Sequence, residues 1–155
     1  MVTLCERHQP SVTATEATRP VLAHGVHDMT GISLGAVVLD CPDPLALAEF
    51  YRAVLGGEVQ SSSADWVNLV VDGRTLAFQR AANHQPPSWP DGVPQQFHLD
   101  LEVTQYAGPH ALVISLGATA LDPVEPPGDP GQQASERTWR VYADPAGHPF
   151  CLCMC

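Results

Sequence analysis

Apolar and polar residues follow one another in the same order in both halves of this 155-residue chain. In the first half, a β-branched and aliphatic stretch over 32–39 predicts a strand, and apolar residues spaced as one helical stripe over 47–55 predict a helix. Asp43-Pro44 is typical of a helix start and Gly56-Gly57 of a helix end. Three further strands are expected over 58–61, 66–71 and 75–79, the last two joined by a tight turn at Asp72-Gly73.

The second half repeats this order of elements. Residues 96–103 alternate between apolar and polar side chains, so His98, Asp100 and Glu102 are expected on one face of a strand. A helix is expected from about Pro109, and three strands are expected over 119–124, 139–142 and 149–155. The pattern therefore predicts a βαβββ module in each half. Because such a module cannot bury its own sheet face, we expect the two to pack into one α+β domain with a curved mixed sheet.

The domain organisation follows from where this pattern begins and stops. Residues 1–30 carry little that could form a core and are expected to be a flexible N-terminal arm. The folded domain is expected over 31–155, with modules at 31–80 and 95–155 joined by a proline-rich linker at 81–94.

The charge balance narrows the classes of partner. With 17 acidic against 7 basic residues the net charge is −10, and no basic run is present, so neither nucleic acid nor a membrane is an expected partner. No stretch approaches the roughly 20 apolar residues of a membrane span, and residues 1–30 contain no signal-peptide pattern. Five cysteines without a C-x-x-C pair favour reduced thiols, so we expect a cytoplasmic protein.

Several motifs together resemble one known superfamily. The segments that carry the resemblance are 38–43, Phe50-Tyr51, Leu55-Gly56-Gly57, 96–101 and 144–152. They are similar to the vicinal oxygen chelate (VOC) superfamily, which contains glyoxalase I, extradiol dioxygenases, fosfomycin-resistance enzymes and bleomycin-resistance proteins. The segment 89–92, with the ending Gly-His-Pro-Phe-Cys at 147–151, resembles the glyoxalase-like subgroup common in actinobacteria.

The resemblance implies where a metal would bind. In metal-dependent members, ligands come from the first and last strand of each module, at positions held here by Ala36, Ala77, His98 and Cys151. Alanine cannot coordinate a metal, and a thiolate suits softer cations than the oxygen ligand it replaces. Asp100 offers a third donor on the face of His98. We therefore expect no cofactor, with a divalent metal at His98 and Cys151 as the alternative.

The candidate site residues follow from the resemblance and the strand pattern. The catalytic candidates are His98, Asp100 and Cys151, since His98 can donate, accept or move a proton. In the alternative, structural interpretation, His98 is a hydrogen-bonded pocket residue, Cys151 is a core residue, and the tryptophans belong either to the core or to the pocket wall. The residues expected to contact a ligand are His98, Asp100, Glu102, Asp40, Trp66, Trp89 and Trp139.

The sequence is consistent with three functions. The first is a protein that binds a small aromatic or polar organic molecule without the usual metal. The second is a metal-dependent lyase, isomerase or dioxygenase that uses His98. The third is a structural paralogue that serves only as a dimer partner, and a homodimer is expected in any case.

Overall fold

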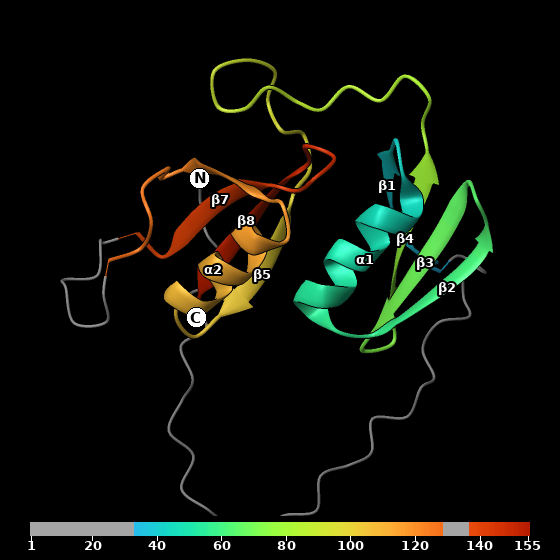
Figure 1. The fold of residues 1–155 in the computed structure, drawn as a ribbon, viewed down its shortest axis with the longest axis horizontal. Coiled ribbons are helices and arrows are strands. Elements are labelled where there is room, and N and C mark those ends of the chain that lie inside the picture. Colours follow the sequence, from blue (N-terminus) through green and yellow to red (C-terminus); the bar gives the residue numbers. More distant parts are fainter. Residues whose placement is uncertain (1–32, 129–136) are drawn as a thin grey trace, which may run out of the picture. The chain divides into compact units, whose positions relative to one another are not determined.

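A computed structural model describes residues 33–128 and 137–155, which contain two helices and eight strands (Figure 1). The predicted arm at 1–30 lies outside the described residues. The first module runs β1 (Val37–Cys41), α1 (Pro44–Leu55), β2 (Glu58–Ser63), β3 (Trp66–Val71) and β4 (Arg74–Arg80). The second runs β5 (Leu99–Val103), α2 (Ala107–Ser115), β6 (Thr119–Asp122), β7 (Trp139–Ala143) and β8 (Pro149–Met154).

Each module forms its own mixed four-stranded sheet. The strand orders are β1-β4-β3-β2 and β5-β8-β7-β6, so both sheets have the same topology. The first and last strands of each module along the chain, β1 with β4 and β5 with β8, pair in parallel, and the other pairs are antiparallel. The prediction of an α+β fold from two βαβββ modules is confirmed, with two separately hydrogen-bonded sheets making up the predicted mixed sheet.

Helix α1 begins and ends where the sequence predicts. The Asp43 side chain accepts a hydrogen bond from the backbone nitrogen of Ala46 at 3.1 Å, which caps the helix start. Gly56 ends the helix with φ 76°, a conformation that favours glycine. Helix α2 begins at Ala107, before the predicted Pro109, and has no side-chain cap.

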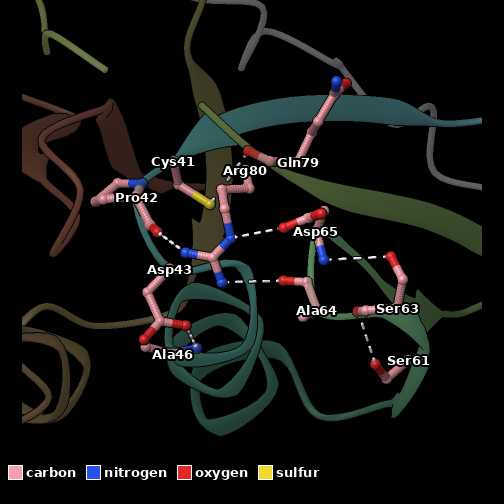
Figure 2. A network of polar contacts seen from close by, with 10 residues as sticks. All are labelled: Cys41, Pro42, Asp43, Ala46, Ser61, Ser63, Ala64, Asp65, Gln79 and Arg80. Carbon is pink, nitrogen blue, oxygen red and sulfur yellow. Dashed lines mark hydrogen bonds and ion pairs between the residues drawn. The ribbon is translucent and has the colours of Figure 1, made fainter. Parts of the chain in front are cut away.

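Arg80, at the end of β4, joins the loops at one end of the first sheet (Figure 2). Its Nε lies 2.8 Å from Asp65 Oδ1, and its two terminal nitrogens donate to the carbonyls of Pro42 and Ala64 at 2.7 and 3.1 Å. Near it, the Cys41 thiol donates to the carbonyl of Gln79. Because Arg80 and Asp65 are exposed, this network holds the loop geometry and contributes little to global stability.

The hydrophobic core is shared by the two modules. Tyr51 of α1 stacks on Phe78 of its own sheet at 5.7 Å between ring centroids and meets Phe150 of β8 edge-on at 6.4 Å. Its hydroxyl also donates to the buried Asp144 Oδ2 at 3.0 Å. The modules therefore pack against each other through one aromatic cluster, as expected for units that cannot bury a sheet face alone.

Strand β5 starts later than the alternation predicts. Gln96 has φ 61°, and the Phe97 backbone nitrogen bonds the carbonyl of Gln95 at 2.6 Å, so the chain turns before it extends. From Leu99 onward the predicted alternation holds, with Asp100 and Glu102 on the face opposite the core.

The cysteine prediction needs one correction. Cys41, Cys151 and Cys153 are buried free thiols, as expected, whereas Cys155 is disulfide-bonded.

Within the described residues, no helix is long and apolar enough to cross a membrane.

Candidate functional site

A cleft of about 320 Å³ opens where β1 meets the first residues of β5 and β8. Val38 and Asp40 of β1 line one side, and His98 and His148 line the other. Phe97 adds an aromatic wall and is 61% exposed. The cleft is thus apolar with a few convergent polar groups, which is the usual composition of a small-molecule site.

His98 makes a polar contact through each of its two ring nitrogens. Its Nδ1 lies 3.0 Å from the Gln95 amide nitrogen, and its Nε2 lies 3.3 Å from Asp100 Oδ1. In this arrangement Nδ1 accepts from Gln95, so the proton sits on Nε2 and points at the Asp100 carboxylate. Gln95 and Asp100 therefore hold the orientation of the imidazole, and with this orientation of the Gln95 amide they favour the tautomer protonated at Nε2.

The Gln95 amide oxygen is a buried acceptor without a hydrogen-bond partner among the described residues. Rotating this amide by half a turn would let the oxygen accept from His98 Nδ1 and leave Nε2 with a free lone pair. Such a lone pair beside a carboxylate suits a cation between them. The residues around His98 can thus support either protonation pattern, one for hydrogen bonding and one for metal binding.

Cys151 lies next to these two groups because β5 and β8 pair in parallel, with Asp100 opposite Cys151. One donor atom each from His98, Asp100 and Cys151 lies within 4.8 Å of the others. Burial, and then the nearby Asp100 carboxylate, raises the pKa of the Cys151 thiol to about 12. The thiol is therefore protonated at neutral pH, which favours the core interpretation over a nucleophile, since a nucleophile needs a lowered pKa.

The other predicted residues divide between two places. Asp40 lines the cleft, and Glu102 follows Asp100 on the same face of β5, opposite Cys153. Trp89 and Trp139 pack on a small apolar cluster formed by Val141, Cys151 and Cys153.

Trp66 is not among the cleft residues. It lies on β3 of the first sheet, where its indole nitrogen donates to Asn68 Oδ1 at 2.8 Å. The structure thus brings His98, Asp100 and Cys151 together and places Asp40 in the cleft with His98. It places Trp89 and Trp139 beside Cys151, and Trp66 on the other sheet.

Sequence reasoning missed a second polar cluster at the cleft, centred on the buried Asp144. Its carboxylate accepts from Tyr51 at 3.0 Å, from the backbone nitrogens of Ala146 and His148, and from His148 Nδ1 at 3.0 Å. Burial acts to lower the pKa of His148, but the hydrogen bond and charge of Asp144, with help from Asp40, raise it overall. The turn motif Asp-Pro-Ala-Gly-His was the available signal, since it places His148 four residues after Asp144.

The superfamily's four-position metal set does not fit this chain. In the first sheet Val38 pairs with Ala77 just as Asp100 pairs with Cys151 in the second sheet, so Ala77 holds the position equivalent to Cys151. Ala77 is fully buried and offers only a methyl group. Among the described residues, the group of side chains that could hold a metal is His98, Asp100 and Cys151, all from the second module.

The comparisons agree with this fold. The family model described as "Glyoxalase-like domain" matches residues 36–153. A fosfomycin resistance protein, FosX, from Listeria monocytogenes is 14% identical, with a TM-score of 0.57 over 80% of this chain and 93% of that one. A glyoxalase/bleomycin resistance protein/dioxygenase family enzyme from Burkholderia phytofirmans is 20% identical, with a TM-score of 0.55 over 77% and 96%.

A glyoxalase-related enzyme from Fulvimarina pelagi is 18% identical, with a TM-score of 0.55 over 79% of this chain and 88% of that one. A search of curated proteins found no match. At these identities the solved structures show a shared fold and carry no statement about activity.

Proposed function

The chain belongs to the glyoxalase-like domain family, and from this premise we propose that it binds a small organic molecule at His98 without the superfamily's four-ligand metal site. The observation that carries the proposal is the orientation of His98 in the cleft. Gln95 holds one ring nitrogen at 3.0 Å and Asp100 the other at 3.3 Å, so the imidazole is preorganised, and a ligand acceptor would bind it by taking the place of the half-exposed Asp100 carboxylate at Nε2–H.

The cleft suggests the kind of molecule. Val38 and Phe97 offer apolar walls, and the polar lining from Asp40, His98 and His148 lies close to them. A volume of about 320 Å³ is near the lower end of the range for ligand pockets, which favours a compact molecule. We therefore propose an aromatic or similarly apolar group with one polar substituent that hydrogen-bonds His98 or Asp100.

Screening a chemically diverse library by thermal shift and tryptophan fluorescence tests the proposal. A hit should bind His98→Ala about tenfold more weakly, the equivalent of about 1.4 kcal/mol, because the anchor is lost. His110→Gln is the matched control, since His110 bonds Tyr142 and does not line the cleft. A flat response across the library, or hits indifferent to His98→Ala, would refute the proposal.

One observation favours a second candidate function, a metal-dependent enzyme. The donor atoms of His98, Asp100 and Cys151 lie close together, and the orphaned Gln95 oxygen can hold His98 in the metal-binding tautomer. These three residues would hold a zinc-class ion, leaving an open position. Such an ion would polarise an oxygen of the substrate as a Lewis acid.

Elemental analysis of protein purified without chelators separates the two candidates. A stoichiometric ion that is lost in both His98→Ala and Cys151→Ser would establish the metal-dependent function. Protein without bound metal, and with no affinity for added Zn²⁺ in calorimetry, would exclude it and leave the metal-free binder.

We also propose a homodimer and a cytoplasmic location for the protein, and both rest on the sequence and the resemblance. Light scattering during size exclusion would give the mass in solution, and fractionation of the producing cell would give the location. A monomer whose cleft binds no ligand or metal would contradict the binder, the enzyme and the dimer-partner interpretations alike.

A further inference from the structure

The segment between the modules is fastened to the turn between β7 and β8. We call residues 84–97 the strap. His84 Nε2 bonds the carbonyl of Ala146 at 2.8 Å, and the rings of His84 and His148 lie 5.0 Å apart. Pro86 packs so closely on Gly147 that a Cβ added there would lie 2.3 Å from the Pro86 Cβ. The start of the strap is therefore anchored beside the candidate site.

Beyond this anchor, Trp89 lies against the second sheet. It packs on Val141, Cys151 and Cys153, whose exposed fractions are 0%, 1% and 3%. Cys151 is paired with Asp100 across β5 and β8, so this apolar floor adjoins the His98–Asp100 pair. The half-buried indole of Trp89 thus occupies an apolar surface beside the His98–Asp100 pair.

Little else holds the middle of the strap in place. Among the described residues, no backbone hydrogen bond joins 85–96 to a strand, and Val93 instead bonds Ser88 within the strap. Four of its residues are prolines, which have no backbone N–H to donate. Near the other end of the strap, Gln95 contacts His98. The two ends are therefore fixed, while the contact of Trp89 is mainly apolar packing.

We propose that Trp89 is an internal plug in an aromatic-ligand site, and that the ligand binds by taking the place of its indole on the floor of Val141, Cys151 and Cys153. This inference rests on the proposed function and names the ligand class. The ligand is a planar heteroaromatic molecule of about indole size whose polar edge reaches His98 and Asp100. Because Asp100 and Glu102 pair with Cys151 and Cys153 of the floor, a neutral or cationic ring fits better than an anionic one.

Thiol labelling tests the plug without any ligand. The rates at which N-ethylmaleimide labels Cys151, Cys153 and Cys41 are measured by mass spectrometry in the wild type, Trp89→Ala and Trp89→Phe. We expect Trp89→Ala to speed labelling of Cys151 and Cys153 at least tenfold, with Trp89→Phe in between. Cys41, buried in the first module, should keep its rate, because its cover is the core and not the strap.

Val93→Ala is the matched control in the same segment, since Val93 is 59% exposed and should leave all three rates unchanged. Unchanged rates for Cys151 and Cys153 in Trp89→Ala would overturn the plug. A parallel rise at Cys41 would also overturn it, because that result reports general loosening of the fold.

Binding of a planar cationic dye, proflavine, tests the ligand class. If Trp89 is a plug, Trp89→Ala should bind proflavine about tenfold more tightly than the wild type does. The same variant should bind an anionic dye, anilinonaphthalene sulfonate, more weakly than it binds proflavine. Weaker proflavine binding by Trp89→Ala than by the wild type would mean that Trp89 forms a wall of the site, and it would overturn the inference. If that binding is nevertheless lost in His98→Ala, the proposed function is still supported. No proflavine binding by either protein overturns the aromatic ligand class itself.

Discussion

The hydrogen bond between Tyr51 and Asp144 offers a direct measure of how strongly the two modules are joined. Tyr51→Phe removes the hydroxyl that donates 3.0 Å to Asp144 Oδ2 and keeps the ring that stacks on Phe78. Both partners are buried, and the acceptor is a carboxylate, so the bond belongs to the stronger class of about 1.5–3 kcal/mol.

The lower end of that range applies here. After the substitution, Asp144 still accepts from two backbone nitrogens and from His148, so its carboxylate is not left without partners. We therefore expect the free energy of unfolding to fall by about 1.5 kcal/mol. For a domain of this size the melting temperature should fall by about 5 °C.

Urea unfolding followed by circular dichroism measures the effect, with a lowered midpoint and an unchanged slope. Tyr106→Phe is the matched control, because the buried Tyr106 hydroxyl makes no side-chain hydrogen bond within the described residues, and its loss should change stability by under about 0.5 kcal/mol. Equal effects of the two variants would refute the reasoning. A decrease in slope for Tyr51→Phe alone would instead indicate that the modules unfold separately.

Two further predictions concern the same end of the second module. The pKa of His148 is raised in the folded protein, so the interaction of His148 with Asp144 stabilises the fold. This contribution to the free energy of unfolding is fully present below the pKa of the unfolded state, about 6.5, and is lost as the pH rises through the pKa of the folded state. Asp144→Asn should flatten that decline in urea midpoints measured between about pH 6 and 9, and an unaltered profile would contradict the assignment to His148. Gly147→Ala should destabilise by about 1–3 kcal/mol, since Gly147 has φ 90° and its added Cβ would meet Pro86. Gly73→Ala, at φ 72° in open space, measures the backbone strain alone, so an equal loss in both variants would show that the Pro86 contact is unimportant.

Local patterns predicted most of the elements. The cap at Asp43, the apolar stripe of α1 and the alternation of β5 all depend on residues a few positions apart, and each occurs in the structure. The start of β5 was predicted too early, because Gln96 takes a left-handed conformation that no apolar pattern reveals. The start of α2 was also misplaced, since it lacks a side-chain cap to mark it.

The candidate site was partly visible in the sequence. His98, Asp100 and Cys151 were identified from strand alternation and from the resemblance, and the structure brings their donor atoms within 4.8 Å. Trp66 was grouped with them because aromatic residues on strands could be core or pocket wall, and sequence offers no means to separate the two. His148 was not among the candidates, because its partner Asp144 is buried against Tyr51 only in the folded protein.

By itself, the amino-acid sequence determined the order of the elements, the duplicated module and the donor types on one face of β5, since all three are set by neighbouring residues. Only the tertiary structure decided that Asp144 meets Tyr51, 93 residues away, and that Trp89 lies on Cys151 and Cys153. Such contacts depend on how two sheets and a linker pack together. Packing minimises exposed apolar surface over the whole domain, so no local pattern can specify it.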